Sequence, residues 1–465
     1  MNSETVRVPK AELDAQWAHM RAVRETLPPG KKYHIVTLGC QMNVRDSETL
    51  AGMLVEMGFS EAPTREEADL IVYNTCCVRE NAENKALGNV IWLKELKKNK
   101  PDMIICVGGC MTQEAGVAET LKRQYPFIDL VFGTHNAYRF PEYLRTVLTE
   151  RARVADVMNI DGVIAEGLPV ARSNPYFGFV NIMYGCDNFC SYCIVPYVRG
   201  RERSRDEADI LDECKRLRDA GVQEIMLLGQ NVNSYRGGGA NFANLLAKVD
   251  ELGIPRVRFM TSHPKDLSDE LIDAYRTLKH LMPNLHLPVQ AGNDEILTLM
   301  NRRYSREQYL SLVKRLRAAR PDIGLTSDII VGFPGETEAQ FEDTLSLARE
   351  ARFDAAYTFI YSPRNGTRAA RMPDPVSAEE KTRRIERLIA LQLGITSEIL
   401  NEQIGRVEEV LVDSVSARSD LTVGGKTPRA HMVNFPGTRD LIGKTVRVKI
   451  TSAGKNTLRG EQIKE

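Results

Sequence analysis

Short apolar segments alternate with helix-length amphipathic segments along most of the 465 residues, and few folds accommodate such an alternation. A first series has its apolar segments at residues 34–38, 70–73, 103–107 and 130–132. A second series has them at residues 177–183, 224–228, 257–261, 285–289, 325–331 and 355–361. Strand–helix alternation is typical of a parallel sheet covered by helices. We therefore expect an α/β protein: an N-terminal parallel-sheet α/β domain and then a partial (β/α)6 version of the eight-unit barrel.

The two ends of the chain depart from this pattern. Residues 1–30 are polar with helical spacing and end at Pro28-Pro29-Gly30, so we interpret them as a surface extension. After a helical stretch over 378–400, short alternating runs predict a small all-β barrel at the C-terminus. The expected domains are an N-terminal extension (1–30), an α/β domain (31–150), the partial barrel (170–400) and the all-β domain (402–465).

Composition and charge exclude several classes of protein. With 43% hydrophobic residues the chain can bury real cores, and no apolar window is long enough to span a membrane. Charged residues occupy the place of a signal peptide's apolar region, so we expect a cytoplasmic protein without membrane contact. Lys plus Arg (62) equals Asp plus Glu (62), so a nucleic-acid partner would have to be bound by local patches.

Nine cysteines in a chain without secretion signals argue against a disulfide framework. Cys186, Cys190 and Cys193 form a CxxxCxxC motif in the loop after the first strand of the barrel. Three thiolates suit a [4Fe-4S] cluster, because they leave one of its four irons free to bind a small molecule. Zinc is the alternative, but a structural zinc site needs a fourth ligand and no histidine is near in sequence.

A second set, Cys40, Cys76 and Cys110, lies just past the carboxyl ends of three strands of the first domain. Those ends share one edge of a parallel sheet, where ligands bind. From the residues alone, a second three-thiolate cluster and three buried cysteines are equally good interpretations. The other cysteines are interpreted as structural: Cys77, Cys106 and Cys214.

Several motifs resemble those of radical S-adenosylmethionine (SAM) methylthiotransferases. The CxxxCxxC motif at this barrel position resembles that of the radical SAM superfamily. Further motifs match the methylthiotransferases over nearly the whole chain from about Tyr33, ending in what looks like their TRAM domain: Gly39-Cys40-Gln41-Met42-Asn43, Asp46-Ser47-Glu48, Asn74-Thr75-Cys76, Gly109-Cys110, Arg199 to Arg205 and His286-Leu287-Pro288-Val289-Gln290. The Gly-Cys-Gln-Met-Asn variant resembles the MiaB family of tRNA enzymes.

This resemblance implies two [4Fe-4S] clusters and two uses of SAM. Cys40, Cys76 and Cys110 would ligate an auxiliary cluster that carries the sulfur to be transferred, and a first SAM would methylate that sulfur. A second SAM, cleaved at the cluster of Cys186, Cys190 and Cys193, would give a 5′-deoxyadenosyl radical that removes hydrogen from carbon 2 of the adenine. The implied activity is methylthiolation of N6-isopentenyladenosine at position 37 of tRNA.

Supporting residues can be proposed for the SAM site. Tyr192 could contact the adenine or seal the loop from water. Gln230 and Asn231 could bind the amino-acid end of SAM, and Gln290 and Asp328 its ribose. The alternative for these four is capping of the following helices.

RNA contacts and partners complete the expectations. Four arginines between Arg199 and Arg205 could follow an RNA backbone, or be exposed charge. Lys426, Arg429 and Lys455, in or near turns of the all-β domain, fit RNA binding or a solvated surface. The expected partners of this monomer are a tRNA anticodon stem-loop, a flavodoxin- or ferredoxin-type reductant and a sulfur donor. The alternatives are threonylcarbamoyladenosine tRNA as substrate, or a non-catalytic iron–sulfur RNA-binding protein.

Overall fold

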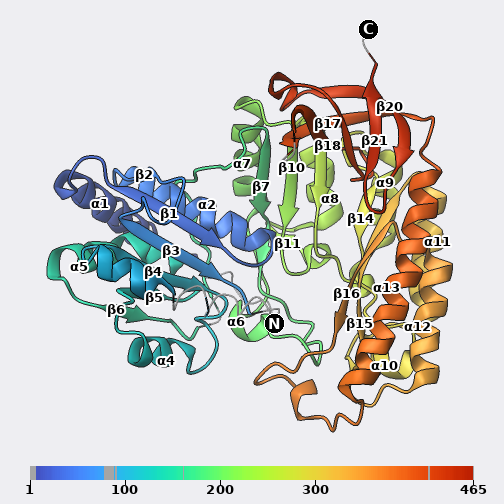
Figure 1. The fold of residues 1–465 in the computed structure, drawn as a ribbon, viewed down its shortest axis with the longest axis horizontal. Helices are drawn as coiled ribbons and strands as arrows, with labels where there is room; N and C mark the ends of the chain where they lie inside the picture. Colours follow the sequence, from blue (N-terminus) through green and yellow to red (C-terminus); the bar gives the residue numbers. More distant parts are fainter. Residues whose placement is uncertain (1–6, 78–87, 89–91, 161, 417–418, 464–465) are drawn as a thin grey trace.

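The computed structural model describes residues 7–77, 88, 92–160, 162–416 and 419–463. Figure 1 shows a blue-to-teal α/β domain beside a larger barrel-like domain, with a red all-β domain at the C-terminal end. The α/β architecture predicted from the alternation is confirmed. Among the described residues, no helix has both the length and the apolar character that crossing a bilayer would require.

The first domain is built on a parallel sheet with the strand order β2-β1-β3-β4-β5-β6. Its strands are β1 (Lys32–Thr37), β2 (Ser60–Glu61), β3 (Leu70–Thr75), β4 (Ile104–Gly109), β5 (Leu130–Phe132) and β6 (Val154–Asp156). Its helices are α1 (Lys10–Thr26), α2 (Gln41–Glu56), α4 (Val117–Gln124) and α5 (Phe140–Glu150), with a short 3-10 turn η1 (Ala137–Arg139). Every residue of β3 is buried, as expected for a parallel strand covered on both faces.

Helix α1 corrects the prediction of a surface extension. Met20 and Val23 of this helix are buried, and they pack with residues of α2 and α5 against one face of the sheet. Gln16 is also buried and hydrogen-bonds Glu142 of α5. This helix has too few apolar residues for its sequence to distinguish it from a fully solvated helix. Those few residues nevertheless complete the core of the first domain.

The second domain carries the six predicted strands in two three-stranded parallel sheets, β13-β10-β7 and β14-β15-β16. A parallel bridge between Val257 and Leu281 connects the two halves. The six strands are β7 (Phe177–Asn181), β10 (Glu224–Leu228), β13 (Arg256–Phe259), β14 (Asn284–His286), β15 (Gly324–Val331) and β16 (Ala355–Ile360). Short strand pairs lie outside the two sheets: β8 (Met183–Tyr184) with β9 (Arg203–Ser204), and β11 (Arg236–Gly237) with β12 (Ala240–Asn241).

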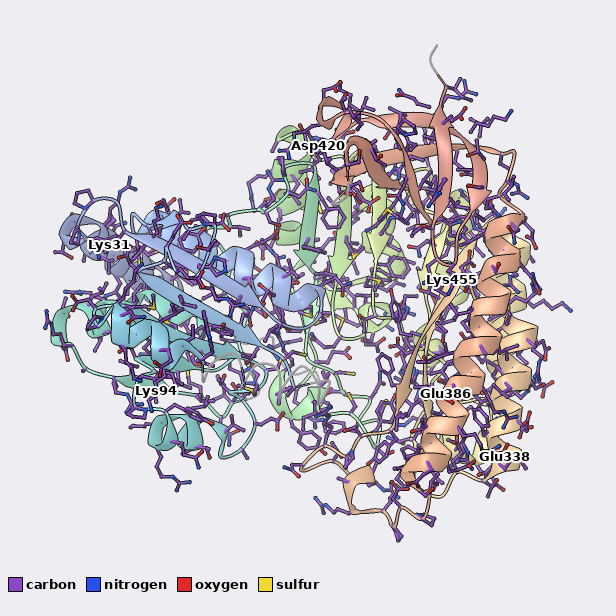
Figure 2. The ribbon with its side chains drawn as sticks, viewed as in Figure 1. Lys31, Lys94, Glu338, Glu386, Asp420 and Lys455 are labelled. Atoms are coloured by element: carbon purple, nitrogen blue, oxygen red, sulfur yellow. The ribbon has the colours of Figure 1, made fainter. Side chains whose placement is uncertain are left out.

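Helices cover the outside of these sheets. They are α7 (Glu207–Asp219), α8 (Phe242–Asp250), α9 (Asp269–Thr277), α10 (Asp294–Leu299), α11 (Arg306–Ala319), α12 (Glu338–Ala351) and α13 (Ala378–Asn401). Helix α6 (Val195–Val198) and the 3-10 turns η2 (Val232–Ser234), η3 (Pro264–Asp266) and η4 (Ala369–Arg371) lie in the connections. Figure 2 shows Glu338 and Glu386 on α12 and α13, at the outer edge of the domain, as expected for the solvated side of a covering helix.

The C-terminal domain is a closed five-stranded barrel in the order β17-β18-β19-β21-β20. Its strands are β17 (Val407–Ser416), β18 (Ser419–Lys426), β19 (Met432–Pro436), β20 (Thr445–Ala453) and β21 (Leu458–Gln462), with a 3-10 turn η5 (Arg439–Leu441). Strand β21 was not predicted. Its residues Leu458 and Gly460 are buried, and a Cβ at Gly460 would meet Val448, so little apolar signal marks this strand in the sequence.

The turn after β18 docks the small barrel on the second domain. Arg258 donates to the carbonyls of Thr427 and Pro428 at 2.9 and 2.8 Å. Arg429 forms an ion pair with Asp354 at 2.6 Å, and His431 Nε2 lies 2.8 Å from the same carboxylate. Arg429 was expected to be a candidate RNA contact, and this is corrected: its guanidinium serves the contact between the two domains.

Candidate active site

The CxxxCxxC motif forms a compact loop directly after β8. Gly185 has φ +75°, and a Cβ there would come 2.0 Å from the Arg201 carbonyl oxygen, so only glycine fits. Burial is the main cause that raises the pKa of the Cys186 thiol to about 12, and the neighbouring Cys190 contributes. Burial also raises the pKa of the Cys193 thiol, and the neighbouring Cys190 and Cys186 contribute to this rise. The loop therefore brings the three thiols together in a partly enclosed place.

Cys40, Cys76 and Cys110 also come together, at the carboxyl edge of the first sheet. Cys40 precedes α2, and the other two follow β3 and β4 directly. A Cβ at Gly39 would lie 3.1 Å from Cys76 Sγ, so the turn before Cys40 passes closely against Cys76. Burial raises the pKa of the Cys110 thiol to about 12, with smaller contributions from Cys76 and Cys40.

A buried amide network fixes the loops of this first set. Asn43 Nδ2 donates to the Thr75 carbonyl at 2.9 Å, while Asn74 Nδ2 donates to the Asn43 carbonyl at 2.8 Å and to Ser47 Oγ at 3.0 Å. Cys40 Sγ donates to Asn43 Oδ1 at 3.5 Å. The Asn and Ser residues of the sequence motifs therefore join α2 to the ends of the strands that carry the cysteines.

The two cysteine sets border one contact between the domains. Helix α6 begins just after Cys193, and its Val198 packs in the same core cluster as Cys110 and Cys77 of the first domain. Thr134 donates to the Val198 carbonyl at 2.7 Å. Ile194, the residue after Cys193, packs in the same cluster, so the chain beside each set reaches this contact.

A cavity of about 780 Å³ adjoins the loop that carries Cys186, Cys190 and Cys193, which we call the radical loop. Its lining includes Cys193 and three residues proposed for the SAM site, namely Tyr192, Gln290 and Asp328. Tyr361, which is also buried in this lining, was not predicted, and its hydroxyl has no hydrogen-bond partner among the described residues. The size and the mixture of apolar and polar walls suit a nucleoside-sized ligand.

Gln230 and Asn231 do not line this cavity. The Gln230 side-chain carbonyl accepts from the Gly185 amide at 2.6 Å, and its amide nitrogen contacts the sulfur of Met42 in the first domain. Asn231 Nδ2 donates to Asp266 at 2.7 Å. In the structure Gln230 thus holds the start of the cysteine loop against the first domain.

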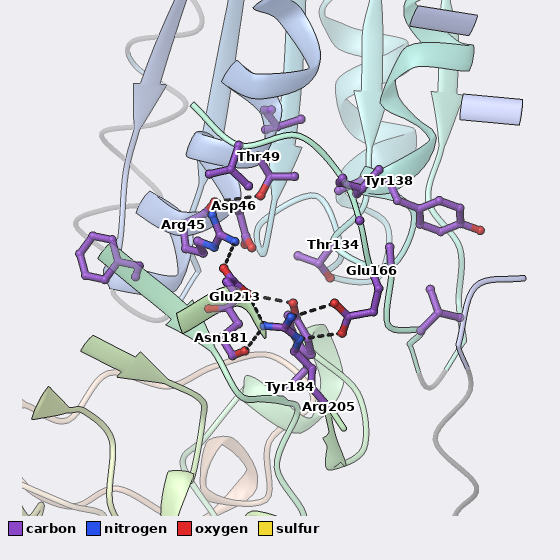
Figure 3. Close-up of a pocket in the computed structure, with 18 of the residues that line it drawn as sticks. Arg45, Asp46, Thr49, Thr134, Tyr138, Glu166, Asn181, Tyr184, Arg205 and Glu213 are labelled. Atoms are coloured by element: carbon purple, nitrogen blue, oxygen red, sulfur yellow. Dashed lines mark hydrogen bonds and ion pairs between the residues drawn. The ribbon is translucent and has the colours of Figure 1, made fainter. Parts of the chain in front are cut away.

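The arginine run from Arg199 to Arg205 divides into buried and exposed members, which corrects the expectation that all four could follow an RNA. Arg199 donates to Cys110 Sγ at 3.1 Å, and Arg205 donates to Glu166 and Glu213 at 2.7 Å each. Figure 3 shows Arg205 between these two carboxylates, with Arg45 of the first domain reaching Glu213 from the other side at 2.5 Å. Arg201 remains exposed and lies over Phe189.

The cysteine geometry can be tested against zinc. Within the described ranges, no three His, Cys, Asp or Glu side chains converge closely enough to hold a single metal ion. Each set offers three cysteine thiols, the donors that iron–sulfur clusters take, and three such ligands leave one iron of a [4Fe-4S] cluster open. A structural zinc site takes four protein ligands.

Three family models match the chain. The radical SAM superfamily model covers residues 180–348, the model of uncharacterized protein family UPF0004 covers residues 32–133 and the TRAM domain model covers residues 401–463. Among solved structures, the radical SAM methyltransferase TsrM from Kitasatospora setae has a TM-score of 0.53 and 15% identity, covering 73% of this chain and 77% of that one. This likeness concerns the fold alone.

Curated relatives match almost the whole chain. The tRNA-2-methylthio-N(6)-dimethylallyladenosine synthase of Acetivibrio thermocellus is 51% identical over 447 residues, which are 95% of this chain and 93% of the relative. The synthase of the same name from Alkaliphilus oremlandii is 52% identical over 439 residues, covering 94% and 93%.

The fold and the cysteine loop define a radical SAM enzyme with a TRAM domain. More narrowly, the chain belongs to the family of the tRNA-2-methylthio-N(6)-dimethylallyladenosine synthases, so the resemblance to the MiaB branch is confirmed. Membership of the radical SAM superfamily implies SAM and one [4Fe-4S] cluster.

Proposed function

We propose that this protein methylthiolates carbon 2 of N6-isopentenyladenosine at position 37 of tRNA, giving 2-methylthio-N6-isopentenyladenosine. The name shared by its relatives supports this substrate. The observation that carries the proposal is that Cys110 of one set packs in one core cluster with Ile194, the residue after Cys193 of the other set. A reaction that needs both a radical and a sulfur requires two such sites within reach of one base.

The two sets would hold two [4Fe-4S] clusters. Cys186, Cys190 and Cys193 would ligate the cluster that binds SAM at its open iron, and Cys40, Cys76 and Cys110 would ligate the auxiliary cluster. When bound, these groups supply a 5′-deoxyadenosyl radical and the transferred sulfur, respectively. The protein supplies the enclosure, since Cys110 and Cys186 are buried and Cys76 follows a fully buried strand.

The cavity beside Cys193 would bind the nucleoside part of SAM. Asp328 lies 3.5 Å from His286 Nε2, so its carboxylate is oriented within the cavity wall. Gln290, at φ +74°, follows β14 and is tied by its backbone to Asp328 and Ile330 of β15. We propose that Gln290 and Asp328 hydrogen-bond the ribose while Tyr192 contacts the adenine. For Gln230 we propose a structural role, the orientation of the cysteine loop, in place of the expected contact with the amino-acid end of SAM.

The RNA would approach over an exposed aromatic surface near the radical loop. Tyr197 is 51% exposed, and its ring packs edge-to-face with that of Phe189. Arg201 lies over Phe189, and the exposed Arg368 and Arg371 line a hollow with Tyr197. Unpaired loop bases stack on such rings while arginines contact phosphates. A base in the anticodon loop is already accessible, so little unpairing is required.

The TRAM barrel would add a weaker, backbone-directed contact. Lys455, exposed on the turn between β20 and β21, remains a candidate for it (Figure 2). The electron for SAM cleavage would come from a flavodoxin- or ferredoxin-type protein, and a separate donor would restore the sulfur.

The decisive experiment is anaerobic. The protein is reconstituted with iron and sulfide and given reductant, SAM and two anticodon stem-loops, one bearing isopentenyladenosine and the other threonylcarbamoyladenosine. We expect a methylthio product only on the isopentenyl RNA, identified by mass spectrometry of the nucleosides. Cys110→Ala should lose this product while 5′-deoxyadenosine still forms. Product on the other RNA would change the substrate, and absence of SAM cleavage with both clusters loaded would refute the radical reaction.

A further inference from the structure

Arg199, a buried arginine of the second domain, reaches the first cysteine set. Its side chain is 6% exposed and follows α6 directly. Nε donates to Cys110 Sγ at 3.1 Å, and Nη2 forms an ion pair with Asp46 at 2.7 Å. Nη2 also donates to Asn43 Oδ1 at 3.4 Å. The guanidinium thus joins one proposed cluster ligand to the amide network that fixes another.

An arginine also contacts the set of Cys186, Cys190 and Cys193, which we call the radical set, but this arginine comes from the same domain as its cysteines. Arg302 Nη1 lies 3.5 Å from Cys190 Sγ, and the same guanidinium donates to the Pro288 carbonyl and the Tyr304 hydroxyl. All these partners belong to the second domain. Arg199 differs because it crosses between domains, from the element that follows the radical loop to a cysteine of the first sheet.

A guanidinium so placed acts on a cluster electrostatically. It stays protonated in proteins, and an N–H···S bond to a ligating thiolate is one of the factors that set the potential of an iron–sulfur cluster. Burial keeps water from screening this charge. A cation at this position stabilises the reduced, more negative form of the cluster.

We propose that Arg199 is a positioning residue of the auxiliary site, where its guanidinium orients the Cys110 thiolate and raises the reduction potential of the cluster. This inference rests on the proposed function, because it requires a cluster at Cys40, Cys76 and Cys110. It adds that the second domain, through Arg199, controls the electronic state of the group held by the first.

The test isolates the auxiliary cluster. In a parent variant with Cys186→Ala, Cys190→Ala and Cys193→Ala, iron binds only at the first set, and its potential is measured by a redox titration followed by electron paramagnetic resonance. We expect Arg199→Gln to shift the potential to a more negative value and Arg199→Lys, which keeps the charge, to lie between Gln and the parent. A matched control is Arg205→Gln, which removes another buried arginine from the same region, one that pairs with Glu166 and Glu213 instead of a proposed cluster ligand. Its potential should equal that of the parent.

Each outcome supports or contradicts the proposed role of Arg199. An unchanged potential in Arg199→Gln at full iron content, or an equal shift in Arg205→Gln, would overturn the inference alone. If Arg199→Gln binds no iron, uptake by Arg199→Lys would support the inference, and failure of both would show that Arg199 serves folding instead. If the parent itself binds no cluster, the proposed function and the inference both fail.

Discussion

Cys186, Cys190 and Cys193 share one loop, whereas Cys40, Cys76 and Cys110 follow three neighbouring strands of one sheet. Local turns assemble the set of Cys186, Cys190 and Cys193, with Gly185 and Phe189 at positive φ. The set of Cys40, Cys76 and Cys110 exists only when β1, β3 and β4 lie side by side in parallel. The geometry of a site on one loop depends mainly on the conformation of that loop. The geometry of a site on several strands depends on the folding of the whole domain that contains the sheet.

The largest effect that tests this comparison is expected from two adjacent cysteines. Cys76→Ala should remove the auxiliary cluster, about four irons per chain, together with the methylthio product. SAM cleavage at the radical set should continue. Cys77→Ala is the matched control, because its thiol is buried in the core cluster; it should keep the iron and cost about 1–2 kcal/mol of stability. Iron and sulfide analysis with assays of 5′-deoxyadenosine measures both, and equal iron loss in the two variants would contradict the assignment.

The contrast between the two sets also explains what the sequence could predict. The spacing of Cys186, Cys190 and Cys193 is a local property, so the motif alone indicated a cluster. For Cys40, Cys76 and Cys110 the residues left two interpretations open, because convergence depends on which strands are neighbours. The family motifs then favoured one of them, while the ligation itself remains a proposal.

Contacts between domains were the part that sequence reasoning missed. Arg199 and Arg205 stand in one short arginine-rich run with Arg201, yet only the last is exposed. Arg429 in the barrel turn likewise pairs with Asp354 of another domain. The packing of the folded domains against one another determines which charged side chains face solvent. The periodicity within a single segment carries no information about that packing. Helix α1 was misinterpreted for the same reason, since its core partners lie on α2 and α5.

The second largest effect should come from this misinterpreted helix. Met20→Ala is expected to destabilise the first domain by about 2–4 kcal/mol, because a fully buried side chain leaves a cavity. Both tryptophans of the chain, Trp17 and Trp92, lie in the first domain, so fluorescence during denaturation reports its unfolding. Auxiliary iron should be lost at lower denaturant than radical-set iron. The exposed Arg21→Ala should leave the transition within about 0.5 kcal/mol, and an equally small effect of Met20→Ala would return α1 to a surface role.

Glycines beside the two sets should give a smaller and separable effect. Gly109 has φ +102°, and a Cβ would come 2.3 Å from the Thr75 carbonyl oxygen, whereas a Cβ at Gly185 would meet the Arg201 carbonyl. Each Ala variant should cost about 1–3 kcal/mol through strain, with iron lost chiefly from the set beside it. Gly116→Ala has a similar positive φ of +80° but open space around it, so it should lose no iron. The same iron loss from both sets in either variant would show that the two sites do not respond independently.

The smallest expected effect is a pH dependence of the free energy of unfolding, caused by Glu202 near the radical loop. The pKa of Glu202 is raised to about 7, mainly by burial. The carboxylates of Asp187 and Asp266 act in the same direction, while the hydrogen bond from Ser234 and the charge of Lys265 oppose it. The folded protein therefore holds this proton more tightly than the unfolded chain does, so the stability from it is complete below the ordinary glutamate pKa and is lost as the pH rises through about 7. Glu202→Gln mimics the protonated form at every pH. In the cluster-free protein it should match the parent near pH 4, below the ordinary glutamate pKa, and exceed it by about 1–2 kcal/mol near pH 8. Denaturant titrations at the two pH values measure this difference, and a constant difference between them would mean that Glu202 titrates normally beside the radical loop.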